Sequence, residues 1–150
     1  MLTESKNRVR SNTDACVNRA IDEQMRARVC QISHEGPHAI ERRLRELDQE
    51  WDIERCLETM APSMTLLGLS LSVLKGRHWL LLPLMVQGFF LQHALQGWCP
   101  PMPVMRRLGV RTEGEINEER NALKALRGDF AGAETPRPNA VERAVEAARS

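Results

Sequence analysis

The sequence has little charge in its middle third. Between residues 59 and 105 the only charged residues are Lys75 and Arg77, although Lys, Arg, Asp and Glu make up 27% of the chain. These two charges lie in a Lys-Gly-Arg-His turn that joins two apolar segments, residues 57–74 and 79–98. At 1.5 Å per residue the segments measure about 27 and 30 Å, close to the thickness of a hydrocarbon core. The pattern predicts an all-α fold built on a two-helix transmembrane hairpin.

Motifs for catalysis and metal binding are also lacking. The four cysteines are Cys16, Cys30, Cys56 and Cys99. Their spacing matches no zinc site and no CxxC motif, so we expect free thiols in a reducing compartment. His34 and His38 are separated by Gly-Pro, which breaks the helix that would align them for a metal. Without a glycine-rich phosphate loop, a Gly-x-Ser-x-Gly turn or paired catalytic carboxylates, we expect no enzymatic activity, no metal and no cofactor.

Residues 1–14 contain no apolar run, so we expect no cleavable signal peptide and an insertion signal within the hairpin itself. The net charge is +1 and no basic stripe stands apart from nearby acids, which argues against nucleic acid as a partner. Seven arginines flank the apolar segments, against Lys75 and Arg77 in the turn: Arg42, Arg43, Arg45, Arg55, Arg106, Arg107 and Arg111. This bias predicts that both termini are cytoplasmic.

Two tryptophans are candidate interface anchors. Trp79 and Trp98 lie about 28 Å apart along a helix, which would place one indole in each headgroup layer. The alternative is that both are core residues of a soluble bundle. Because Phe89 and Phe90 lie on the same apolar segment, we favour the membrane.

Each apolar segment also has a candidate packing face. The first has a row of small residues that lets helix backbones approach closely: Ala61, Thr65, Gly68 and Ser72. The second has Gly88, Gln92 and Gln96 at intervals of four residues. Glutamine side chains in lipid need hydrogen-bond partners, so this row should face the other helix or another copy of the chain. His93, beside this row, is an ionisable residue at membrane depth, either functional or a neutral side chain that hydrogen-bonds between helices.

The polar arms are expected to be helical. We divide the chain into an N-terminal helical arm (residues 1–36), a charged amphipathic helix (37–56), the hairpin (57–98), a proline-rich exit with a C-terminal helix (99–128) and a disordered tail (129–150). The amphipathic helix should continue into the membrane or bend at its surface. Its charged face is either solvated or part of a coiled-coil contact. Thr112 and Glu115 form a capping box for the last helix, and Gly128 ends it.

One stretch of the chain resembles a known family. Trp79–Leu82, Ala94–Gly97, Cys99-Pro100 and Arg106–Gly109, preceded by Glu54-Arg55, are similar to the YgaP-like transmembrane domain family. The resemblance covers about residues 54–112. It implies a bacterial inner-membrane hairpin that dimerises, and a link to sulfur or persulfide chemistry.

The chain departs from the family namesake because no rhodanese domain precedes the hairpin. No cysteine opens the required loop of backbone N–H groups, so the sulfurtransferase activity does not carry over. Cys99 is the candidate reactive thiol, helped by Arg106 or Arg107, or else a small residue at a helix-to-loop transition.

Two functions remain open. The first is a non-enzymatic inner-membrane hairpin that self-associates as a homodimer or small oligomer and supports the handling of sulfur compounds. The second is a soluble all-helical interaction protein whose apolar helix pair forms an oligomer core.

Overall fold

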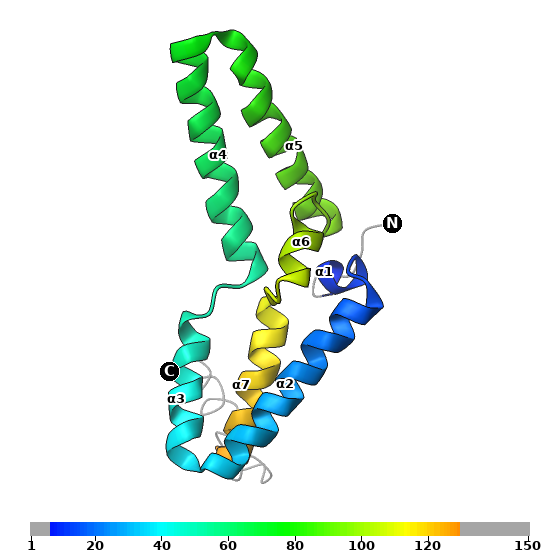
Figure 1. Cartoon of the computed structure of the whole chain (residues 1–150), viewed down its shortest axis with the longest axis vertical. Coiled ribbons are helices and arrows are strands. Elements are labelled where there is room, and N and C mark those ends of the chain that lie inside the picture. Colours follow the sequence, from blue (N-terminus) through cyan, green and yellow to red (C-terminus); the bar gives the residue numbers. More distant parts are fainter. Residues whose placement is uncertain (1–6, 130–150) are drawn as a thin grey trace, which may run out of the picture.

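A computed structural model describes residues 7–129, and all the regular secondary structure in that range is helical. The helices are α1 (Arg8–Ser11), α2 (Ala15–Glu35), α3 (Pro37–Gln49), α4 (Ile53–Lys75), the 3₁₀ helix η1 (Arg77–Leu80), α5 (Leu81–Gln96), α6 (Met102–Arg107) and α7 (Glu113–Arg127). The molecule is elongated. Helices α4 and α5 form a long antiparallel hairpin at one end, and α2, α3 and α7 lie together at the other (Figure 1).

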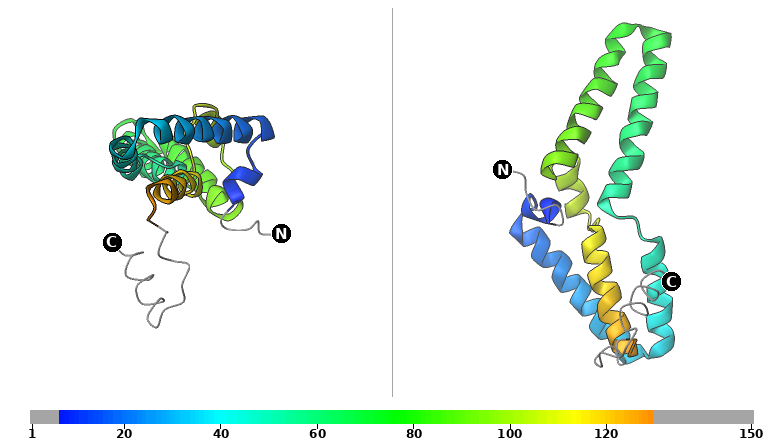
Figure 2. Two further views of the ribbon diagram at one scale, coloured as in Figure 1. Left: turned by 90° about the horizontal axis from the view of Figure 1, so that it is seen from below. Right: turned by 180° about the vertical axis from the view of Figure 1, so that it is seen from behind.

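The three-helix head consists of α2, α3 and α7, each in contact with the other two. Figure 2 shows these helices grouped away from the hairpin tip. Its core contains the buried side chains of Ile40, Leu44, Leu47, Ile116 and Leu123. The apolar face expected on the charged helix therefore packs within the chain, between α2 and α7.

The turn between α2 and α3 is made by Gly36, whose φ of +94° favours glycine. Pro37 then begins α3, a position where a missing N–H is tolerated.

Helix α3 does not run on into α4. It ends at Gln49, and Glu50 has an extended backbone. Asp52 then caps α4, accepting a hydrogen bond from the backbone N–H of Arg55 at 2.6 Å. The sequence left open a continuous helix or a bend, and it did not indicate the position of the break, because the capping aspartate lies within a run of charged residues. The non-helical residues 50–52 offset α4 sideways from α3 (Figure 1).

The hairpin turn lies where the sequence predicted it. Helix α4 ends at Lys75, Gly76 adopts a φ of +116°, and η1 leads into α5. The regular part of the second helix is shorter than predicted, because it begins with a 3₁₀ turn and ends at Gln96, where Gly97 is left-handed.

The segment after the hairpin contains one helix that the sequence did not predict. Helix α6 forms in the proline-rich exit because its prolines lie at its start, where they remove no helical hydrogen bond. The capping box of α7 is confirmed: Thr112 and Glu115 exchange side-chain-to-backbone hydrogen bonds, and Gly128 ends the helix with a φ of +90°. The predicted tail lies outside the described residues, apart from Asp129.

Candidate membrane hairpin and its junction with the head

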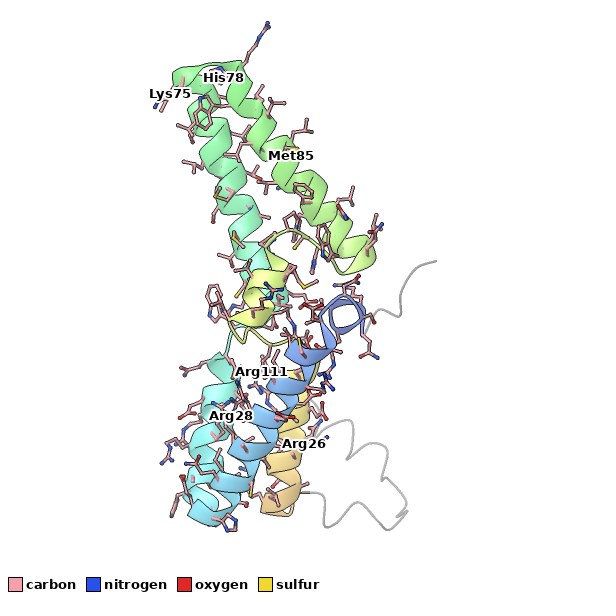
Figure 3. The ribbon with its side chains drawn as sticks, turned by 45° about the vertical axis from the view of Figure 1, so that its right-hand side comes forward. Arg26, Arg28, Lys75, His78, Met85 and Arg111 are labelled. Atoms are coloured by element: carbon pink, nitrogen blue, oxygen red, sulfur yellow. The ribbon has the colours of Figure 1, made fainter. Side chains whose placement is uncertain are left out.

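The hairpin exposes large apolar side chains along its whole length. On α4 the exposed ones include Leu66, Leu67, Leu69, Val73 and Leu74, and on η1 and α5 they include Leu80, Leu81, Leu84, Met85, Leu91 and Leu95. Val73 is 85% exposed and Leu84 is 70% exposed. In Figure 3, Lys75 and His78 mark the tip of the hairpin, and Met85 lies along α5 between the tip and the foot. An apolar surface of this extent needs a covering, either lipid or protein.

Helices α4 and α5 meet closely at Gly68. A Cβ atom added at this glycine would lie 2.5 Å from Cδ of Pro83 and 3.3 Å from Cβ of Leu82. One turn earlier, the Thr65 hydroxyl accepts a hydrogen bond from Nε2 of Gln87 at 2.8 Å. Two members of the predicted first row, Thr65 and Gly68, thus lie toward α5, and a third, Ala61, is buried. The fourth, Ser72, uses its hydroxyl to donate to its own helix.

The predicted row on α5 does not face α4. Gly88 is exposed, and a Cβ added there would meet nothing within 4 Å. Gln96 is exposed and Gln92 is half-buried. A contact between this row and the other helix of the same chain is therefore not formed. The other option, contact with a second copy, stays a prediction.

The two candidate anchor tryptophans lie at opposite ends of the hairpin. Trp79 is half-buried in η1 at the tip, with its ring centroid 5.9 Å from that of His78. Trp98 is half-buried at the foot. His93 is only 3% exposed, and neither of its ring nitrogens has a hydrogen-bond partner among the described residues. The expected interhelical hydrogen bond of His93 is thus not made within that part of the chain.

An apolar cluster closes the foot of the hairpin. It consists of the buried residues Val9, Ile53, Leu57, Cys99 and Met102. Cys99 is 2% exposed, and burial raises the pKa of its thiol. A reactive cysteine needs access and a lowered pKa, so the geometry gives no support to the reactive role and favours a packing role.

The first helix caps the end of α5. Arg8 donates from Nη1 to the carbonyl of Ala94 at 3.3 Å, and Asn12 donates from Nδ2 to the carbonyl of Gln96 at 2.8 Å. Gly97 allows this approach, because a Cβ there would lie 2.6 Å from the backbone of Arg8. These contacts satisfy carbonyls that a helix end leaves unpaired, and the Arg8 cation complements the helix dipole.

A buried ion pair connects this junction to the head. Arg106 of α6 donates two hydrogen bonds of 2.7 Å to the two carboxylate oxygens of Glu115 on α7. Glu115 also accepts from Arg10 at 2.8 Å, and Arg10 in turn binds Asp22 of α2. Burial opposes ionisation of Glu115, but hydrogen bonds from Arg106 and the Thr112 backbone hold the pKa of its carboxyl below the usual value.

A second ion cluster lies one turn further along α7. The Glu119 side chain is 0% exposed and binds Arg111, Arg43 and Arg28. Arg111 also forms a two-point contact with Glu50, at 2.7 and 2.8 Å. Burial disfavours the charge on Glu119, but its arginine partners lower its pKa nonetheless. Figure 3 shows Arg28 on the head and Arg111 nearer the junction, where its backbone carbonyl accepts a hydrogen bond from the Ile53 N–H at the start of α4.

No sequence motif predicted these clusters. Arg43 and Arg111 were counted only as flanking charges, and Arg106 was counted also as a possible helper of Cys99. Arg106 and Arg111 pair with glutamates nine and eight residues later, whereas Arg43 pairs with Glu119, 76 residues away. The Glu115 and Glu119 spacing of four residues on one helix was the available signal, since it places both carboxylates on one face.

The described residues contain no group of His, Cys, Asp or Glu arranged to hold a metal ion. All four cysteines lie in the described range and are unpaired. By length and composition, one helical stretch of the described chain could cross a membrane. The stretch runs from Pro37 to Lys75, and its apolar part lies in α4, because α3 carries many charged residues. Only 17% of this apolar part is buried within the structure, whereas a core helix of a soluble protein is mostly buried. Helix α5 has 16 residues, fewer than the 18 that a candidate membrane span needs.

Searches of protein-family models, curated proteins and solved structures find no match to this chain. The resemblance to the YgaP-like family therefore stays a prediction from the sequence.

Proposed function

We propose that this protein is a non-enzymatic integral membrane protein of the bacterial inner membrane, anchored by α4 and α5. The observation that supports this most is the exposure of leucine, valine and methionine side chains along both helices, beyond the reach of the head. Each apolar side chain left in water instead of an apolar medium costs about 1.5–3 kcal/mol. A bilayer would remove that cost for the whole hairpin at once.

The helix lengths support the same placement. Helix α5 has 16 residues, about 24 Å, and the four-residue η1 adds about 8 Å. Together they approach the ~30 Å of a hydrocarbon core. In this arrangement Trp79 and Trp98 lie near the two membrane surfaces, and the charged head lies outside.

The proposal places the head and both termini in the cytoplasm. The arginines near the foot outnumber Lys75 and Arg77 at the tip. This bias favours retention of the head on the cytoplasmic side of the membrane. A phosphatase reporter fused after Ser150 should be inactive, and a fluorescent cytoplasmic reporter at the same site should be active. Periplasmic phosphatase activity would overturn this orientation.

Self-association is part of the proposal. Gly88 is open on the outer face of α5, where a second copy of the hairpin can approach closely. The sulfur link implied by the family resemblance is not part of it, because Cys99, the thiol that would carry it, is only 2% exposed.

The alternative is a soluble oligomer whose apolar hairpins pack together in water. Fractionation separates the two. The membrane proposal expects the full chain in the pellet after high-speed centrifugation, retained through an alkaline carbonate wash and released by detergent. Recovery as a discrete oligomer in the soluble fraction without detergent would favour the alternative.

A further inference from the structure

An apolar groove lies at the foot of the hairpin. Its volume is about 180 Å³, and it is bounded by α4, α5 and the Cys99–Pro101 segment. It exists because α4 and α5 meet at Gly68 and Pro83 nearer the tip and diverge toward the foot (Figure 1). Side chains on its walls include Leu57, Ala61 and Met64 from α4 and Phe89 and Phe90 from α5.

The chemistry of the groove limits what can occupy it. Carbon and sulfur atoms line it almost completely, so a polar ligand would lose its hydrogen bonds to water without replacement. An apolar cavity of about 150 Å³ stays dry and holds a molecule as large as benzene. A space of this size accepts several methylene groups, whereas a helix about 10 Å in diameter does not fit.

We propose that the groove binds the hydrocarbon chain of a membrane lipid, lying parallel to the hairpin. This rests on the proposed membrane placement. From Leu57 to Met64 the groove follows two turns of α4, about 10 Å. It begins just above the Arg8–Glu54 contact of 3.5 Å and ends below the exposed leucines of the upper hairpin. That is the depth at which acyl chains begin below the headgroups.

Other occupants fit less well. A second copy would present a helix, which is too wide for the groove. The parts of this chain outside the described residues are 1–6 and 130–150, and in both of them charged residues recur at short intervals. A charged segment in the groove would bury ions with no partner on its walls.

The test uses the full chain in nanodiscs of phosphatidylethanolamine and phosphatidylglycerol, with a trace of phosphatidylcholine that carries a diazirine midway along one acyl chain. After illumination, adducts are mapped by mass spectrometry. We expect several-fold more adduct on Met64 and Phe89 than on Leu84 and Leu91, which lie outside the groove and are freely exposed.

Two variants fill the groove, and one serves as the matched control. Ala61→Phe and Val86→Phe each place a larger side chain on its wall, and both should remove the excess labelling. Leu84→Phe adds an aromatic ring on the exposed side of α5 and should leave it unchanged. Circular dichroism and melting curves identify any variant that fails to fold, and the wild-type adduct map holds independently of all three.

Several results would overturn the proposal. Equal adduct density inside and outside the groove would show ordinary contact with bulk lipid only. Protein–protein cross-links at Met64 would assign the groove to a second copy. Labelling that appears only after removal of residues 130–150 would assign it to the tail. Failure of the full chain to enter nanodiscs is a different outcome, because it refutes the membrane placement itself.

Discussion

The two buried carboxylates of α7 each bind more than one arginine. Glu115 and Glu119 each contact arginines from several elements, and through them α1, α2, α3 and α6 are all tied to one helix. A buried ion pair adds little net stability compared with apolar packing, but removing one partner leaves a charge with no compensation. The network therefore specifies how the elements are arranged and makes that arrangement sensitive to single substitutions.

Glu115→Gln should destabilise the head. The substitution keeps the shape but removes the charge opposite Arg106, whose side chain is fully buried. We expect a loss of about 3 kcal/mol in the free energy of unfolding. Denaturant titration of the detergent-solubilised protein, followed by circular dichroism, measures it. Glu118→Gln, an exposed neighbour on the same helix, is the control and should change stability by less than about 0.5 kcal/mol. Equal losses of unfolding free energy in the two variants would show that the Arg106–Glu115 ion pair makes no specific contribution to stability.

Acid should destabilise the head through the same residues. The folded pKa values of Glu115 and Glu119 lie below the usual 4.5. Their stabilisation is therefore fully present above pH 4.5 and is lost as the pH falls through the lower folded values. The melting temperature should drop below about pH 4.5, and the drop should be smaller in the double variant Glu115→Gln, Glu119→Gln. An identical acid profile in the double variant would assign the effect to other carboxylates.

At the scale of the elements, α4 and α5 pack closely at Gly68. Gly68→Leu should force α4 and α5 apart, because even a Cβ at this position would overlap Pro83. We expect a destabilisation of about 1–3 kcal/mol, typical of overpacking. Thermal unfolding in detergent measures the change.

Gly88→Leu is the matched control for the same element. It adds the same side chain on α5, where nothing lies within 4 Å, so the stability of the single chain should not change. A shift from dimer to monomer in this variant, measured by analytical ultracentrifugation, would support self-association through the outer face of α5. Equal loss of stability in both variants would contradict the packing described for Gly68.

The sequence predicted the elements better than their contacts. The helix break at Gly36-Pro37 and the Thr112–Glu115 capping box are local signals, and both are present in the structure. The position of the break before Asp52 and the short α6 were not predicted, because a capping aspartate among charges and prolines at a helix start give weak signals. The pairing of Arg106 with Glu115 and the capping of α5 by Arg8 depend on the tertiary fold. No local pattern carries that information.

At the scale of the whole molecule, polar and apolar surfaces are separated along the long axis. The head has an apolar core and a network of ion pairs. The hairpin has large apolar side chains on its outside. A soluble domain of this size keeps most of its large apolar residues inside, so the separation calls for two different surroundings. The proposed bilayer placement supplies them.

The most direct test compares the environment of two leucines that are both exposed in the structure. Leu84 lies on the hairpin and Leu126 on the head, and they are 70% and 54% exposed. Each is replaced by cysteine in a chain whose four native cysteines have been removed, and the protein is reconstituted in liposomes permeable to a charged maleimide. The account predicts rapid labelling of Leu126→Cys and almost none of Leu84→Cys until detergent is added. Equal labelling of both cysteines before detergent is added would contradict the membrane hairpin.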